Sequence, residues 1–128
     1  MERRGSSRLF FMDIQYLLVL STCPDETVAS RIARQLVEEK LAACVNRLTP
    51  VRSTYSWKGR IEDEPEVLLI IKTTAARYGE LELRLKALHP YEVPEIIALP
   101  IVRGSGSYLE WLAAETRSPD GGKPETGK

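Results

Sequence analysis

The chain has 128 residues, of which 43% are hydrophobic, and its 18 Lys and Arg balance 18 Asp and Glu. This length suits a single domain with one core, and the apolar content excludes a wholly disordered chain. No run approaches the roughly 18 apolar residues of a membrane span. The neutral net charge argues against a dedicated nucleic-acid binder. Two cysteines are too few for a disulfide scaffold, so we expect a cytoplasmic protein.

Both ends of the chain are expected to lie outside the folded domain. Residues 1–11 combine arginines with apolar residues in the manner of a signal peptide, but Asp13 and Gln15 interrupt the apolar region. We therefore favour a flexible N-terminal extension over a secretion signal. Residues 117–128 are rich in Pro, Gly and charged side chains, which is typical of a disordered tail. The domain is accordingly placed at residues 12–116.

The first half of the domain predicts a strand, a helix and a second strand. The apolar run 14–22 is rich in β-forming residues and indicates the first strand. Residues 22–25 offer a hydroxyl, a proline and a carboxylate, which favour a helix start. Apolar residues then recur at spacings of three and four from 27 to 41, as in an amphipathic helix. Residues 43–57 alternate loosely and contain Pro50, which predicts a long, bent strand.

The second half predicts a hairpin, a helix, a strand and a short final helix. We place the hairpin tip at 63–65 and its returning strand at 67–72. The next helix is capped by Thr73 or Thr74 and ends before Pro90, because a proline disfavours the helical conformation of the residue before it. Its expected apolar stripe consists of Tyr78, Leu81, Leu85 and Leu88. Ion pairs are expected on its exposed side between Glu80 and Arg84 and between Glu82 and Lys86. The last strand is expected at 96–102. The final helix is expected to begin with a capping box at 107–110.

This element order predicts an α/β (α+β) fold, a ferredoxin-like βαββαβ sandwich with an antiparallel sheet, both helices on one face and a short C-terminal helix. A sheet covered on one face should alternate apolar and polar residues. The runs 17–20, 67–71 and 96–99 do not alternate, which is typical of sheets buried on both faces. Because the chain offers helices for one face only, we expect another subunit to cover the second face.

His89 is the sole histidine and the leading candidate for a metal ligand. A neutral imidazole is the commonest metal ligand in proteins, and Glu92 and Glu95 are the nearest side chains that could complete a site. The alternative is that the ring packs beside Pro90 as a structural end to the helix. A site for Cu²⁺ or another divalent cation is thus predicted at His89, Glu92 and Glu95, with no metal required for folding.

The cysteines and an acidic segment provide weaker candidates. Cys44 lies among small apolar residues and is expected to be a buried free thiol, with ligation of a soft metal as the alternative. Cys23 stands at a helix start, where the helix dipole stabilises a thiolate, and is expected to be the more reactive thiol. The acidic residues from 62 to 66 predict a solvated turn, with weak cation binding as the alternative.

Six short segments occur in one order between about residues 12 and 115. They are Pro24-Asp25-Glu26, Leu41-Ala42-Ala43-Cys44-Val45-Asn46, Ser53-x-Tyr55-x-Trp57-x-Gly59, residues 66–73, residues 89–96 and Tyr108-Leu109-x-Trp111. Together they resemble the CutA family of divalent-cation tolerance proteins. The resemblance implies a ferredoxin-like subunit in a tight homotrimer, as in PII-type signalling proteins. It also implies a non-catalytic protein of divalent metal (copper) tolerance that binds copper weakly.

The resemblance also bears on individual residues. Metal-binding members use a cysteine near the end of the first strand and a Cys or His in the second helix, and this chain has Ser21, Arg84 and Leu88 at those positions. The resemblance places a cleft between subunits near Tyr55, Trp57, Lys72, Tyr91 and Glu95. Lys72 is the candidate contact for a small anion.

Two other function classes stay open beside metal tolerance. One is a PII-like signalling trimer that binds a small anionic effector in its clefts. The other is a trimeric scaffold that anchors another protein. An enzyme is not expected, because the sequence contains no catalytic triad pattern, phosphate-binding loop or zinc-protease motif.

Overall fold

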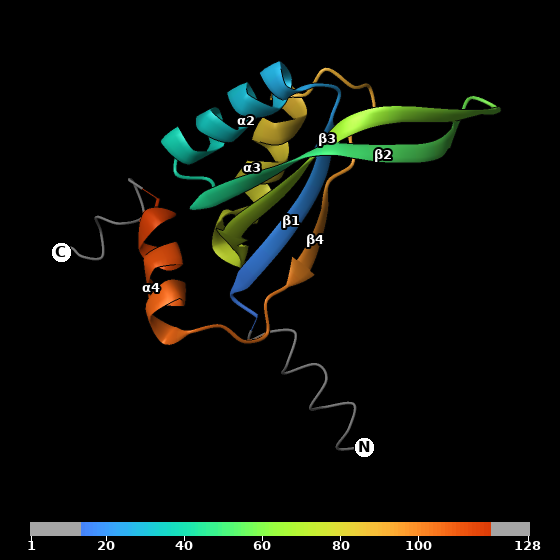
Figure 1. Ribbon diagram of the computed structural model, residues 1–128. Helices are drawn as coiled ribbons and strands as arrows, with labels where there is room; N and C mark the ends of the chain where they lie inside the picture. The colour runs from blue at the N-terminus through green and yellow to red at the C-terminus, as the bar shows by residue number, and fades with distance from the viewer. Residues whose placement is uncertain (1–13, 119–128) are drawn as a thin grey trace.

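The structure is a computed structural model that describes residues 14–118. Its elements are β1 (Tyr16–Cys23), α2 (Glu26–Glu38), β2 (Cys44–Trp57), β3 (Arg60–Thr74), α3 (Ala75–Leu88), β4 (Ile97–Pro100) and α4 (Gly106–Glu115). The strands form an antiparallel sheet in the order β2-β3-β1-β4 (Figure 1). The predicted α+β architecture is therefore confirmed. Residues 1–11 and most of the predicted C-terminal tail lie outside the described residues.

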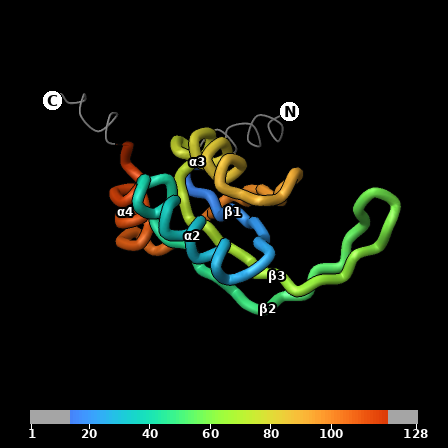
Figure 2. The backbone as a smooth tube through the Cα atoms, turned by 90° about the horizontal axis from the view of Figure 1, so that it is seen from above, coloured from blue at the N-terminus to red at the C-terminus, as the bar shows by residue number. Residues whose placement is uncertain are grey.

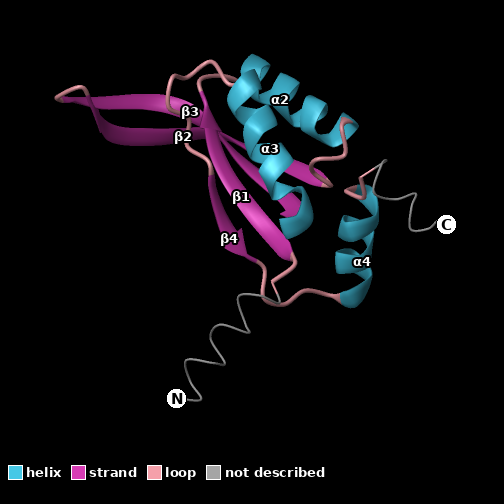
Figure 3. Cartoon of the chain, turned by 180° about the vertical axis from the view of Figure 1, so that it is seen from behind, coloured by secondary structure: helices cyan, strands magenta, loops and turns pink. Residues whose placement is uncertain are grey.

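The two long helices pack side by side on one face of the sheet (Figure 3). Helix α2 begins where Asp25 accepts a hydrogen bond from the backbone N–H of Val28, at 2.9 Å, which satisfies one of the free donors of the first turn. Apolar side chains of both helices meet alternate residues of the central strands in a single core. Its fully buried members include Val19, Ile32, Leu36, Leu69, Ile71, Leu81 and Leu85.

The opposite side of the sheet, which we call the open face, carries a second set of apolar side chains. Strand register places them on one surface: Leu18 and Leu20 of β1, Leu68 and Ile70 of β3, and Ile97 and Leu99 of β4. Ile97 is 51% exposed and Leu99 is 43% exposed. Helix α4 contacts β3 but lies beside the central strands rather than over them (Figure 1). Within residues 14–118, the open face is left without a covering layer.

Strands β2 and β3 form a long hairpin that projects away from the helices (Figure 2). Its turn is at Lys58 and Gly59, whose φ angles are 51° and 78°. The predicted tip at 63–65 is wrong, since Asp63 and Glu64 pair with β2 inside the strand. Two-residue hairpin turns favour positive φ at both central positions, which glycine adopts without strain. Pro65 is tolerated because β1 pairs with β3 only from Val67 onward, so β3 has one free edge at the proline.

Several local expectations also need correction. Strand β4 is shorter than the predicted 96–102. The final helix is capped by Ser105, whose Oγ accepts from the backbone N–H of Tyr108 at 3.2 Å, rather than by Ser107. The register shift in β2 between Leu48 and Val51 confirms the bend expected beside Pro50.

The ion pairs of α3 are only partly as expected. The pair Glu82–Lys86 forms, with 3.3 Å between nitrogen and oxygen. Arg84 instead donates to the carboxylate of Glu39 at 2.9 Å, and Glu80 pairs with Arg77. Arg84 thereby links α3 to the end of α2, where Glu39 accepts from the guanidinium with both oxygens. No helix among residues 14–118 is long and apolar enough to cross a membrane.

Candidate functional site

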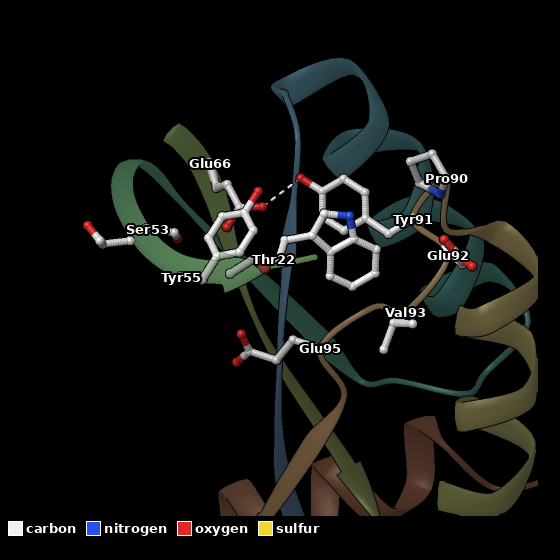
Figure 4. A pocket seen from close by; sticks show the side chains of 11 residues that line it. Thr22, Ser53, Tyr55, Glu66, Pro90, Tyr91, Glu92, Val93 and Glu95 are labelled. Carbon is white, nitrogen blue, oxygen red and sulfur yellow. Dashed lines mark hydrogen bonds between the residues drawn. The ribbon is translucent and has the colours of Figure 1, made fainter. Parts of the chain in front are cut away.

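A cavity of about 670 Å³ opens where the β2–β3 hairpin meets the segment that follows α3 (Figure 4). Aromatic rings and carboxylates dominate its chemistry, and no Lys or Arg is among its lining residues. The aromatic and acidic side chains of the lining are Tyr55, Trp57, Glu66, Tyr91, Glu92 and Glu95.

Two of the rings reach the cavity because β2 alternates its side chains. Tyr55 and Trp57 are two residues apart and therefore point to the same side of the strand. Tyr55 lies opposite Glu62 in the hairpin register. Partial burial, together with the negative charges of Glu64, Glu62 and Glu66, raises the pKa of Tyr55. The hairpin therefore lines one side of the cavity with two aromatic rings, and acidic side chains of the same hairpin surround Tyr55 with negative charge.

Glu66 is the most buried polar side chain of the cavity, with 7% of its surface exposed. The Tyr91 hydroxyl donates to its Oε2 at 2.6 Å, the bond drawn dashed in Figure 4. Glu66 forms no ion pair with any residue from 14 to 118. Burial, and then the hydrogen bond to Glu66 and its charge, raise the pKa of Tyr91. At neutral pH this pair is a protonated phenol held by a buried acidic side chain.

His89 lies behind this pair and fixes the segment that carries Tyr91. Its ring is 7% exposed and tilted against the Tyr91 ring, with 4.7 Å between centroids. The backbone N–H of Tyr91 donates to Nδ1 at 3.1 Å, so Nε2 carries the proton and donates to the carbonyl of Thr22 at 2.8 Å. Burial lowers the pKa of His89 and keeps the ring neutral. Both nitrogens are therefore engaged within the chain.

The predicted metal ligands are only partly brought together. Glu92 and Glu95 line the cavity, whereas His89 does not. Glu92 also lies 4.0 Å from the Lys58 ammonium. Among residues 14–118 no group of three or more His, Cys, Asp or Glu side chains is arranged to hold a metal ion. Donation from His89 to a metal would require one of its two hydrogen bonds to break.

The predicted cleft residues separate into two places. Tyr55, Trp57 and Tyr91 line the same cavity. Lys72 does not, since it lies farther along β3 and its ammonium donates to Oδ1 of Asn46 at 2.6 Å. The cavity is thus acidic and aromatic, without the lysine expected to attract an anion.

Cys23 is fully buried, and burial, reinforced by the negative charges of Glu66 and Asp25, raises the pKa of its thiol to about 12. The expectation of a reactive thiolate at Cys23 is therefore wrong, because desolvation outweighs the helix dipole. Cys44 is half-buried, and both cysteines are free thiols.

The three positions where the family's metal ligands were expected all have structural surroundings. Ser21 is fully buried on the helix-covered side, and its Oγ has no hydrogen-bond partner in the part of the chain that the structure describes. Arg84 binds Glu39, and Leu88 packs against the core.

Sequence reasoning grouped Glu66 with a solvated acidic turn and so missed its role. The signal was its position. Glu66 shares the parity of Leu68 and Ile70, and therefore points to the open face at the edge of a buried run. Thr22, whose carbonyl anchors His89, carried no comparable signal.

Comparison with known proteins agrees with this architecture. The profile of the family described as CutA1 divalent ion tolerance protein matches residues 17–115. The divalent-cation tolerance protein CutA of Thermus thermophilus is 52% identical over 99 residues, covering 77% of this chain and 96% of that protein. Protein CutA of Homo sapiens is 48% identical over 97 residues, covering 76% of this chain and 54% of that protein.

The likeness extends to solved structures. The crystal structure of CutA1 from Oryza sativa superposes with a TM-score of 0.79 at 43% identity, covering 81% of this chain and 95% of that one. Because the family profile spans most of the described residues and the fold agrees, the chain belongs to the CutA1 family of divalent ion tolerance proteins.

Proposed function

We propose that the chain is a non-catalytic homotrimer that takes part in tolerance of divalent metal ions. The observation that carries the assembly is the open face, where six apolar side chains of three strands face outward without a covering layer among residues 14–118. Exposed apolar surface of this extent is typical of protein interfaces. The role in tolerance rests on the name of the family to which the chain belongs.

The open face fits a partner that is itself a sheet. Leu18, Leu20 and Ile70 are already half-buried on the central strands, and the more exposed Ile97 and Leu99 flank them on β4. Further copies of the same chain, packed sheet to sheet, would remove these side chains from water. The number of three copies follows from the family resemblance.

Direct binding of a divalent ion is expected to involve the carboxylates of Glu92 and Glu95. Both line the cavity, and Glu95 forms no ion pair with residues 14–118. Copper prefers nitrogen and sulfur donors, and residues 14–118 of a single chain do not assemble them, because the nitrogens of His89 are engaged and Cys23 is buried. The donor set of one chain thus suits weak binding through oxygen rather than a resident copper centre.

Calorimetric titration of the purified assembly with Cu²⁺, Zn²⁺ and Mn²⁺ tests this proposal. The double variant Glu92→Gln/Glu95→Gln should weaken binding by about tenfold or more, as expected when ligands are removed. Glu110→Gln on α4 is the matched control, since Glu110 is exposed and is not among the residues that line the cavity. A loss of metal affinity in His89→Gln would show that the imidazole is also a ligand. The absence of any heat with all three ions would contradict direct binding.

The alternative of a small anionic effector finds less support. The cavity contains three acidic side chains and no basic one in its lining, and Lys72 lies elsewhere. An anion placed there would be repelled by Glu66, Glu92 and Glu95.

A further inference from the structure

We propose that the cavity beside the β2–β3 hairpin binds an organic ammonium cation, held over the rings of Tyr55, Trp57 and Tyr91 and against the carboxylate of Glu66. The ligand class is an amine or a quaternary ammonium compound. This inference goes beyond the proposed metal tolerance, because its ligand is an organic cation and its principal contacts are the aromatic rings and Glu66 rather than Glu92 and Glu95.

The size of the cavity suits a small molecule rather than a bare ion. Its volume of about 670 Å³ falls in the range of about 300–1,000 Å³ that is usual for small-molecule sites. Figure 4 shows Tyr55, Tyr91 and Glu66 close together around one end of this space. A ligand with an apolar body and one charged group would meet both kinds of surface there.

The three aromatic rings provide the first element of recognition. Tyr55 and Trp57 belong to β2, and Tyr91 belongs to the segment after α3. Two distant segments of the chain therefore contribute rings to the cavity. The faces of aromatic rings carry partial negative charge and attract ammonium groups. Several rings around one space are the arrangement by which proteins recognise quaternary ammonium ligands.

The charge of the cavity provides the second element. Glu66 is buried, forms no ion pair with residues 14–118, and touches the cavity beside Tyr91. Its negative charge also contributes to the raised pKa values of Cys23 and Tyr55. Glu92 and Glu95 add negative charge at the exposed side. A buried carboxylate without a cation is costly, and a cationic ligand would offset that cost.

The chain already holds one ammonium group in this way. The Lys58 nitrogen lies 5.5 Å from the centroid of the Trp57 ring and 4.0 Å from Oε1 of Glu92. This side chain is 70% exposed and does not line the cavity. An aromatic ring and a carboxylate thus already flank an ammonium group at the rim, and the interior repeats that pairing with Tyr55, Tyr91 and Glu66.

The same geometry disfavours other occupants. A metal ion needs several donors at short distance, and no cluster of three acidic, His or Cys side chains is arranged for one within residues 14–118, so Glu92 and Glu95 offer only the weak oxygen site proposed above. One oxygen of Glu66 is also engaged by Tyr91. The lining offers no basic side chain to an anion. The combination of spaced carboxylates and rings therefore selects an organic cation.

The test is an NMR titration of the full chain with tert-butylammonium chloride, using tert-butanol in matched sodium chloride as the neutral ligand of the same shape. The chain has two tryptophans, and only Trp57 lines the cavity, so Trp111 on α4 serves as an internal control. The indole N–H signal of Trp57 should shift in a saturable manner while that of Trp111 does not. The ammonium compound should bind at least about tenfold more tightly than the alcohol.

Variants locate the site and keep the test independent of folding defects. Glu66→Gln removes the charge but can still accept from the Tyr91 hydroxyl, and Trp57→Leu removes one ring at a partly exposed position. Each should weaken ammonium binding by about tenfold, whereas Glu110→Gln should not. In Trp57→Leu the backbone N–H signal of Tyr91 replaces the lost indole signal. Equal affinity for the alcohol, no saturable shift in the unsubstituted chain, or unchanged binding in Trp57→Leu would overturn the proposal. The metal titrations described above do not depend on this result.

Discussion

One buried ring, His89, joins three parts of the chain. Its Nε2 donates to the Thr22 carbonyl of β1, its Nδ1 accepts from the backbone of Tyr91, and its backbone N–H donates to the Leu85 carbonyl of α3. The bond from Tyr91 requires the neutral ring, because a protonated Nδ1 could not accept. The position of Tyr91 in the cavity wall therefore depends on the protonation state of His89.

Acidification should destabilise the fold through His89. Burial lowers its pKa from the usual value of about 6.5, so the unfolded chain binds the proton more tightly than the folded one. The stabilising contribution is present above about pH 6.5 and is lost as the pH falls toward and through the folded pKa. Urea unfolding at about pH 7.5 and pH 5.5, at one protein concentration, should show a lower free energy of unfolding at the acidic pH.

The control for this effect is simple because the chain has one histidine. In His89→Gln the difference between the two pH values should shrink, since no other side chain with an ordinary pKa in this interval is present. An unchanged difference in the variant would show that another group is responsible.

A second prediction compares two buried hydroxyls. Ser21 Oγ has no hydrogen-bond partner in residues 14–118, whereas Thr73 Oγ1 donates to the Leu41 carbonyl at 2.7 Å. Ser21→Ala should leave the free energy of unfolding unchanged or raise it by up to about 1 kcal/mol, and Thr73→Val should lower it by about 1 kcal/mol. Chemical denaturation measures both. A large loss of unfolding free energy in Ser21→Ala would mean that the Ser21 hydroxyl forms a hydrogen bond in the folded protein.

At the scale of elements, the hairpin turn sets where Tyr55 and Trp57 lie. Gly59 has a φ of 78°, and nothing lies within 4 Å of the place a Cβ would occupy. Gly59→Ala should therefore lower the free energy of unfolding by about 1 kcal/mol through backbone strain alone. Gly79→Ala is the matched control, since Gly79 is an exposed helical residue with equal space and should raise stability by about 1 kcal/mol. Equal effects in thermal melts would contradict this account of the turn.

The sequence predicted most elements of the fold because periodicity and caps are local. The apolar spacing of α2 and the stripe Leu81 and Leu85 of α3 depend on nothing outside each helix. The hairpin tip was misplaced because both Lys58-Gly59 and the segment 63–65 have turn chemistry, and only the pairing of β2 with β3 decides between them. The partner of Arg84 was misassigned for the same reason, since Glu39 is distant in sequence.

The candidate site was harder to predict, because its chemistry depends on burial and on contacts between distant segments. Tyr55, Trp57 and Tyr91 were placed together by resemblance, but the hydrogen bond between Glu66 and Tyr91 joins residues 25 positions apart. Strand parity directs Glu66 to the open face but does not predict its burial, because Glu64 has the same parity and is exposed. Nor does the sequence reveal that both nitrogens of His89 are engaged.

In the whole molecule, the two long helices form a layer on one side of the sheet (Figure 3), and the apolar side chains of the open face lie on the other side. The cavity lies at the end of the open face, where Thr22 and Glu66 continue the rows of Leu20 and Leu68. A subunit packed on the open face would therefore lie beside the cavity. The subunit interface and the ligand site would then be adjacent on one surface of the chain.

We propose that further copies of this chain cover the open face, and the mass of the protein in solution decides whether they do. Multi-angle light scattering of the full chain at micromolar concentration tests it most directly. A homotrimer should elute as a single species with three times the 14.4 kDa mass of one chain. A monodisperse species of 14.4 kDa would contradict it, because the apolar residues of the open face would then be exposed to water in the stable form of the protein.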